Sequence, residues 1–173
     1  MQKPTVQASV VLLFDDKGRV CLARKKQPIH HEGGEISYSL GMWNGYGGKM
    51  EKTDATIFHT AVRECFDESG VIVTEKDLSL RARVHFFTKK DDRFESFMEV
   101  SFFFAHIWKG EPQEGKEMGA PKFFQENEIP YHEMMPADKI LFEYIFFGKR
   151  NVYEVRLCGK GVPPEVRVLD EIA

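Results

Sequence analysis

The alternation and spacing of apolar residues predict strands in the first part of the chain. Residues 6–14, VQASVVLLF, are rich in apolar and β-branched side chains, which favours a strand. The polar segment DDKG, residues 15–18, predicts a turn, and RVCLARK, residues 19–25, predicts the returning strand of a hairpin. Residues 27–42 follow no period, so we expect a long loop there, which is either a functional lid or an insertion.

A helical period follows these strands. Between Thr56 and Ser69, apolar residues recur with the i, i+1, i+4, i+5 spacing of one helix face. Asp54 is a candidate N-cap for this helix, and Gly70 is a candidate C-terminal stop. The pattern therefore predicts an amphipathic helix.

The second half of the chain predicts further strands and one more helix. The polar segment KKDDRFE is expected to be a turn between two long strands, and Pro136 suits the first turn of a helix. The expected elements are long strands at 80–88 and 97–108, a short strand at 122–125, a helix at 136–147 and late strands at 152–157 and 165–169. No repeat, linker or low-complexity tract interrupts this order, so we expect a single α+β domain over residues 1–173.

Composition and charge narrow the class of partner. The net charge of −3 gives no support for a nucleic-acid polymer as partner, since such binders usually carry a basic face. No apolar run approaches the ~20 residues of a membrane span, and the N-terminus lacks a signal-peptide cleavage site. The cysteines, Cys21, Cys65 and Cys158, are odd in number and far apart, which predicts reduced thiols in a cytoplasmic protein. We therefore expect a small-molecule partner; the residues favour neither a monomer nor a dimer.

Three carboxylates within five residues are the first candidate site. On a helix, Glu64, Asp67 and Glu68 stand at i, i+3 and i+4 and share one face, where like charges repel. One interpretation is a solvated acidic stripe. The other is a site for Mg²⁺, which prefers carboxylate oxygens completed by waters and substrate phosphates.

The loop before this helix favours the metal site. NGYGGK, residues 44–49, places three glycines around an aromatic residue and ends in Lys49. Glycine lets the backbone approach a ligand closely, and a loop that enters a helix N-terminus can direct N–H groups at phosphate. A tight turn is the alternative interpretation of these glycines.

The segment from Gly47 to Val71 resembles the Nudix box, G-x5-E-x7-R-E-U-x-E-E-x-G-U, where U is a bulky apolar residue. Asp54 stands where the box has glutamate, and eight residues rather than seven separate it from Arg63. Either the loop is one residue longer, or Ala55 holds the glutamate's place. Asp67 replaces the first glutamate of the pair. The resemblance implies a Nudix fold, a mixed β-sheet sandwiched between α-helices (α/β/α).

The resemblance also implies roles for individual residues. In this family Glu64, Asp67 and Glu68 would bind Mg²⁺, with Mn²⁺ as an alternative ion. Arg63 would orient the carboxylates, and Glu117 matches a further glutamate that assists the metal or the attacking water, with surface charge as its alternative.

Within the family, RVCLARKK, MWNGYGGK and EMGAPKFFQENEIPYHEMMPAD resemble the MutT branch that hydrolyses oxidised purine nucleoside triphosphates. Asn44 matches a residue that contacts the base, Met135 replaces a stacking tryptophan, Ala137 replaces one aspartate of a base-reading pair, and Asp138 matches the other. A turn at Asn44 and a helix-terminal charge at Asp138 are the alternatives. The implied substrate-binding residues are Asn44, Gly47, Gly48, Lys49, Lys25, Met135 and Asp138.

The expected function is Mg²⁺-dependent hydrolysis of nucleoside triphosphates, such as 8-oxo-dGTP, to the monophosphate and pyrophosphate. Two alternatives stay open. The substrate is another nucleoside diphosphate derivative, such as ADP-ribose or a dinucleoside polyphosphate, or the domain binds a nucleotide without turnover.

Overall fold

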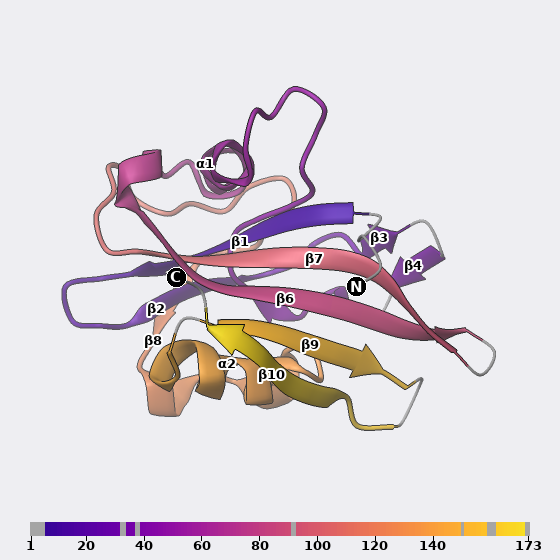
Figure 1. Ribbon diagram of the computed structural model, residues 1–173. Helices are drawn as coiled ribbons and strands as arrows, with labels where there is room; N and C mark the ends of the chain where they lie inside the picture. The colour runs from indigo at the N-terminus through magenta and orange to yellow at the C-terminus, as the bar shows by residue number, and fades with distance from the viewer. Residues whose placement is uncertain are drawn as a thin grey trace.

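A mixed β-sheet forms the centre of the molecule (Figure 1). The structure is a computed structural model that describes residues 6–31, 34–36, 39–90, 93–149, 151–158 and 162–171. In this described part, the strand order is β10-β9-β6-β7-β1-β2-β5, with β8 paired to β2. Neighbouring strands are antiparallel, except that β1 pairs in parallel with β7 and β6 with β9. The strands are β1 (Val6–Phe14), β2 (Val20–Arg24), β5 (Trp43–Asn44), β6 (Leu78–Lys90), β7 (Arg93–Ala105), β8 (Lys122–Phe124), β9 (Asn151–Leu157) and β10 (Glu165–Glu171).

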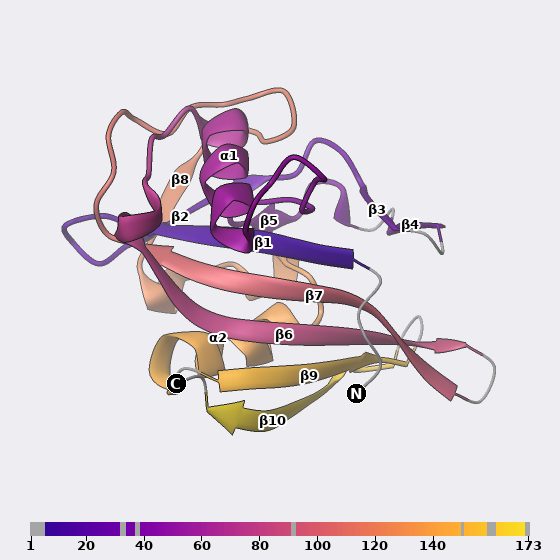
Figure 2. The same cartoon turned by 45° about the horizontal axis from the view of Figure 1, so that its top comes forward.

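Two α-helices cover opposite faces of this sheet (Figures 1 and 2). Helix α1 (Ile57–Ser69) buries Ala61 and Cys65 in one core with Val11 of β1. Helix α2 (Asp138–Phe147) buries Phe142 in a second core with Leu12, the next residue of β1. Successive side chains of a strand point to opposite faces, so β1 contributes to both layers. The α+β class and the α/β/α arrangement are confirmed.

The segment from residue 27 to 42 differs from the expected loop. It contains two short strands, β3 (Ile29–His31) and β4 (Gly34–Ile36), which pair as an antiparallel ladder. This hairpin lies near the start of β1 (Figure 2). Strands of three residues are too short to produce a recognisable period in the sequence.

The turn predicted at KKDDRFE was also too wide. Strands β6 and β7 continue through most of it, to the pair Lys90 and Arg93. Lys89 and Arg93 are exposed, whereas Phe94, which pairs with Lys89, is half-buried beside the Arg156 guanidinium. Polar composition therefore concealed a strand extension held by backbone pairing. The other predicted strands and both helices are present.

The start of helix α1 corrects the predicted N-cap. Thr56 is the N-cap, and its Oγ1 accepts a hydrogen bond from the His59 N–H at 3.1 Å. Asp54, the expected cap, lies two residues earlier and bonds to other groups. Gly70 ends the helix in the left-handed region (φ 74°), as predicted.

Helix α2 is tied to the sheet by an arginine at its C-terminus. The last carbonyls of a helix have no partner within it. Arg81 of β6 donates from Nε to the Ile145 carbonyl at 3.0 Å and from Nη2 to the Gly148 carbonyl at 2.7 Å. Within the described residues, no helix is both long and apolar enough to span a membrane.

Replacing Arg81 with methionine should destabilise the fold. The change leaves these carbonyls unpaired, so we expect the free energy of unfolding to fall by about 2 kcal/mol, measured by urea denaturation. Arg83→Met is the matched control, because Arg83 lies exposed on the same strand, and its effect should stay within about 0.5 kcal/mol. Equal losses in both variants would contradict this function for Arg81.

Candidate active site

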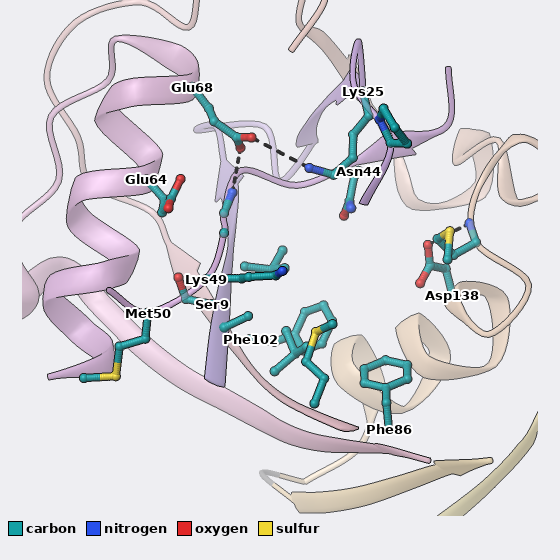
Figure 3. Close-up of a pocket in the computed structure, with 18 of the residues that line it drawn as sticks. Ser9, Lys25, Asn44, Lys49, Met50, Glu64, Glu68, Phe86, Phe102 and Asp138 are labelled. Carbon is teal, nitrogen blue, oxygen red and sulfur yellow. Dashed lines mark hydrogen bonds and ion pairs between the residues drawn. The ribbon is translucent and has the colours of Figure 1, made fainter. Parts of the chain in front are cut away.

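A cavity of about 610 Å³ lies between helix α1, the glycine loop, strand β1 and the start of helix α2 (Figure 3). This volume is in the range of small-molecule sites. It brings together most of the residues that the sequence suggested, from segments far apart in the chain. Those lining it are Lys25, Asn44, Gly47, Gly48, Lys49, Glu64, Glu68, Glu117, Met135 and Asp138. Arg63 and Asp67 do not line it.

Glu68 is the most deeply placed of the carboxylates, only 3% exposed. Its Oε2 accepts a hydrogen bond from the Gly47 N–H at 2.7 Å, and Lys25 Nζ lies 3.7 Å from its Oε1 (Figure 3). Burial raises the pKa of Glu68 to about 7, although Lys25 and the Gly47 N–H lower it, and the Glu64 and Glu117 charges raise it further. A cation between these carboxylates would offset both the lost hydration and the repulsion.

Glu64 stands one helical turn before Glu68 and faces the same cavity (Figure 3). Burial raises the pKa of Glu64, whereas Arg63, which donates to its Oε1 at 2.8 Å, lowers it. A Cβ at Gly48 would lie 2.5 Å from this oxygen, and a Cβ at Gly47 would lie 1.9 Å from the Ser9 carbonyl oxygen. The loop therefore lies this close to β1 only because residue 47 is glycine, whereas a Cβ at residue 48 would displace the end of the flexible Glu64 side chain.

Arg63 holds this arrangement from outside the cavity. It donates to both Asp54 oxygens, at 3.0 and 2.8 Å, and to Glu64. Asp54 also accepts from the Thr60 hydroxyl at 3.0 Å and the Glu51 N–H at 2.9 Å. Asp54 therefore joins the loop to the helix, which Ala55 cannot do because it has no polar side chain.

Asp54→Asn should weaken the protein most at neutral pH. The hydrogen bonds from Arg63 hold the Asp54 pKa well below its usual range. A carboxyl whose pKa is lower in the folded state stabilises above its unfolded-state pKa, near 4, and this contribution is lost as the pH falls. We expect a loss of about 2 kcal/mol at pH 7 that shrinks below about pH 4, measured by urea denaturation across pH.

Asp16→Asn is the control, because Asp16 is exposed in the turn between β1 and β2. A pH-independent loss in Asp54→Asn, or an equal loss in the control, would show that the carboxylate of Asp54 does not hold the loop.

Asp67 is placed differently from the other two carboxylates. Its side chain is 58% exposed, and its Oδ2 lies 3.9 Å from Arg63 Nη1. In the described part of the chain, no three His, Cys, Asp or Glu side chains converge to hold a metal ion. Mg²⁺ usually takes one or two carboxylates, several waters and substrate phosphates, so Glu64 and Glu68 fit such a site.

Glu117 reaches the polar end of the cavity through backbone pairing. Lys25 pairs with Met118, and the Lys26 N–H donates to the Glu117 carbonyl at 2.8 Å. This pairing places Glu117 and Lys25 beside the carboxylates of α1, and the Glu117 charge contributes to the raised pKa of both Glu64 and Glu68. Lys49 lines the cavity from its exposed rim.

The other end of the cavity is mainly apolar, with two polar groups. Asn44 Oδ1 accepts from the Gly45 N–H at 2.9 Å, which leaves its amide nitrogen to donate to a ligand. Asp138, 9% exposed, accepts from the Met135 N–H at 3.0 Å (Figure 3). Burial raises the pKa of Asp138 to about 7, so its carboxyl can donate or accept near neutrality.

The sequence did not reveal the wall between these groups. It consists of residues from β6 and β7 that share one face of the sheet: Phe86, Phe97, Met98, Val100 and Phe102. Ser9, 1% exposed, also lines the cavity, and its hydroxyl has no hydrogen-bond partner among the described residues. A single serine inside the apolar run of β1 was the one signal for it in the sequence.

A glycine loop leading into a carboxylate helix, over a mixed sheet between two helices, defines the class of Nudix hydrolases. The family model for the NUDIX domain matches residues 3–154, and the chain belongs to the Nudix family.

Comparisons with known proteins agree with this assignment. A protein from Danio rerio named oxidized purine nucleoside triphosphate hydrolase is 30% identical over 168 residues, 97% of each chain. A protein of the same name from Mus musculus is 30% identical over 132 residues, 76% of this chain and 74% of its own.

Two solved structures show the fold. The MutT protein from Bacillus halodurans has a TM-score of 0.74 at 20% identity, covering 94% of this chain and 97% of its own. The NUDIX domain of Shewanella oneidensis NrtR, complexed with ADP ribose, has a TM-score of 0.61 at 13% identity, covering 84% and 88%.

Proposed function

We propose that this Nudix hydrolase cleaves nucleoside triphosphates to the monophosphate and pyrophosphate with Mg²⁺, and that oxidised purine nucleotides are its substrates. The observation that carries the proposal is the pair Glu64 and Glu68, both turned into one cavity beside the glycine loop. Both are deprived of water and repel each other, so a cation and a polyphosphate suit them.

We assign a separate role to each residue at the polar end of the cavity. When bound, Mg²⁺ neutralises polyphosphate charge and acidifies a coordinated water; Mn²⁺ is an alternative ion. Glu64 and Glu68 would hold the cation, and the Gly47 N–H and Arg63 hold these two carboxylates in place. Lys25 and Lys49, with the backbone of Gly47 and Gly48, contact phosphate, and Glu117 orients the attacking water. Asp67, which is exposed on α1 outside the cavity, contributes negative charge nearby.

The apolar end suits a purine ring. The aromatic wall, with Met135, covers the ring faces, and Asn44 and Asp138 meet the base edge. An oxidised purine is favoured by the names of the two relatives that share 30% identity.

The three cysteines are free thiols, which supports a cytoplasmic location for the protein.

The second candidate is hydrolysis of ADP-ribose or a related diphosphate. The Shewanella NUDIX domain bound to ADP ribose favours it, because that domain shares this fold. The metal chemistry would be unchanged, and only the substrate and its products would differ. A domain that binds without turnover is disfavoured, since both cavity carboxylates, Glu64 and Glu68, are present.

A substrate panel tests the proposal. Purified protein with Mg²⁺ should release pyrophosphate and a monophosphate from 8-oxo-dGTP faster than from dGTP, while ADP-ribose and dinucleoside polyphosphates should give little product.

Loss of one metal carboxylate removes several kcal/mol of transition-state stabilisation. Since about 1.4 kcal/mol is tenfold in rate, Glu68→Gln and Glu64→Gln should lower kcat by roughly 100-fold or more.

Glu143→Gln is the matched control, because Glu143 is an exposed glutamate of the other helix and should leave kcat unchanged. Asp67→Asn should act more weakly than either cavity variant. Full activity in Glu68→Gln, or no release of pyrophosphate from any triphosphate, would refute the proposal.

Met135→Trp tests the base site separately. An aromatic platform contributes about 1–3 kcal/mol to stacking of a base, so this variant should lower KM for 8-oxo-dGTP by about tenfold. Met135→Leu keeps an apolar cover without a ring and should resemble the wild type. Equal KM values in all three proteins would place the base away from Met135.

A further inference from the structure

Arg24, at the end of β2, joins three segments outside the cavity. Its Nη1 donates to the Gly41 carbonyl at 2.7 Å, and its Nη2 forms an ion pair with the Glu133 carboxylate. Its guanidinium carbon also lies 4.6 Å from the centre of the Trp43 ring. These contacts use the hydrogen bonds and the flat face of the guanidinium together, which a lysine ammonium cannot reproduce.

Each partner of Arg24 is close in sequence to a residue of the base end. Trp43 pairs with Arg24 across the β2–β5 ladder and directly precedes Asn44. Glu133 ends the 3-10 helix η4 (Tyr131–Glu133), two residues before Met135. Arg24 is itself followed by Lys25, and its carbonyl accepts from the Gly119 N–H at 2.8 Å. The guanidinium thus connects the segment that carries Asn44 to the segment that carries Met135 and Asp138.

The contacts of Arg24 contribute more to geometry than to stability. The side chains of Arg24 and Glu133 are 43% and 38% exposed, and ion pairs at such exposure stabilise a fold by at most about 1 kcal/mol. The spacing of two segments around a ligand is more sensitive, since a misplacement of about 1 Å can reduce a rate about 100-fold.

We propose that Arg24 is a positioning residue for substrate selection, setting the distance between Asn44 on one side of the base and Met135 and Asp138 on the other. It acts through Trp43 and Glu133 and does not touch the ligand. The inference rests on the proposed function, because it assigns the base to this end of the cavity.

Arg19 provides a matched control on the same strand hairpin. It forms an ion pair with Asp15 at 2.7 Å, and its guanidinium carbon lies 5.4 Å from the centre of the Phe123 ring. None of these three residues lines the cavity. Arg19→Met therefore removes the same kinds of contact as Arg24→Met without loosening the base end.

The experiment compares kcat and KM for 8-oxo-dGTP and dGTP in the wild type, Arg24→Met, Arg24→Lys and Arg19→Met. In Arg24→Met we expect KM for 8-oxo-dGTP to rise about tenfold, kcat to stay within about threefold, and discrimination against dGTP to fall. Arg24→Lys should not restore KM, because it retains the charge but not the planar fork. Arg19→Met should match the wild type.

Glu133→Gln tests the same connection from its other end. It should raise KM in the same direction, and the double variant Arg24→Met/Glu133→Gln should be no worse than Arg24→Met alone, because both changes break one contact. Calorimetric binding of 8-oxo-dGMP and dGMP to each variant gives a second readout that needs no turnover.

The two hypotheses fail in different ways. A wild type that hydrolyses no triphosphate refutes the proposed function. The affinities for 8-oxo-dGMP and dGMP then show whether Arg24 positions the segments around the base. An active wild type with unchanged KM, affinity and discrimination in Arg24→Met overturns the inference. An equal shift in Arg19→Met overturns it too, since the effect would then come from general loosening.

Discussion

The contact on which the site depends is the hydrogen bond from the Gly47 N–H to the buried carboxylate of Glu68. A carboxylate that is 3% exposed is costly to place unless donors or charges compensate for its lost hydration. The loop supplies one donor only by lying against both β1 and α1, where a Cβ at residue 47 or 48 would collide with its neighbours. Their i, i+4 spacing on α1 makes Glu64 and Glu68 neighbours in one cavity, and a cation would relieve their repulsion.

Side chains outside the cavity hold the loop and both helices in place. Arg63 and Asp54 join the loop to α1, and Arg81 joins the end of α2 to the sheet. Neither arginine lines the cavity. Part of the support for the site therefore comes from arginines that do not line the cavity, so the cavity carboxylates can keep their unfavourable positions while the fold remains stable. Buried, repelling carboxylates cost stability locally, and the hydrogen bonds of the arginines offset that cost elsewhere.

Local patterns in the sequence predicted the longer strands, the carboxylate helix and its approach by the glycine loop, because each depends on neighbours a few residues apart; the short strands β3, β4 and β5 were not predicted. The N-cap was mispredicted, since aspartate and threonine both cap helices and only the distant Arg63 decides that Asp54 is used otherwise. The i, i+3, i+4 spacing put three carboxylates on one face, but the cavity admits Glu64 and Glu68 and leaves Asp67 exposed. The aromatic wall depends on the register of β6 and β7, which no local pattern encodes.

The two ends of the cavity also differ in whether local or long-range contacts form them. Glu64, Glu68 and the loop that holds them lie within one segment of about 25 residues, so a short motif fixes their geometry. The apolar end is assembled from β5, β6, β7 and the start of α2, and long-range contacts such as those of Arg24 join these segments. A substitution there can move Asn44 relative to Asp138 without disturbing the bond between Gly47 and Glu68. A change at Met135 therefore leaves the carboxylate end intact, so the contacts at one end of the cavity can vary while those at the other end stay the same.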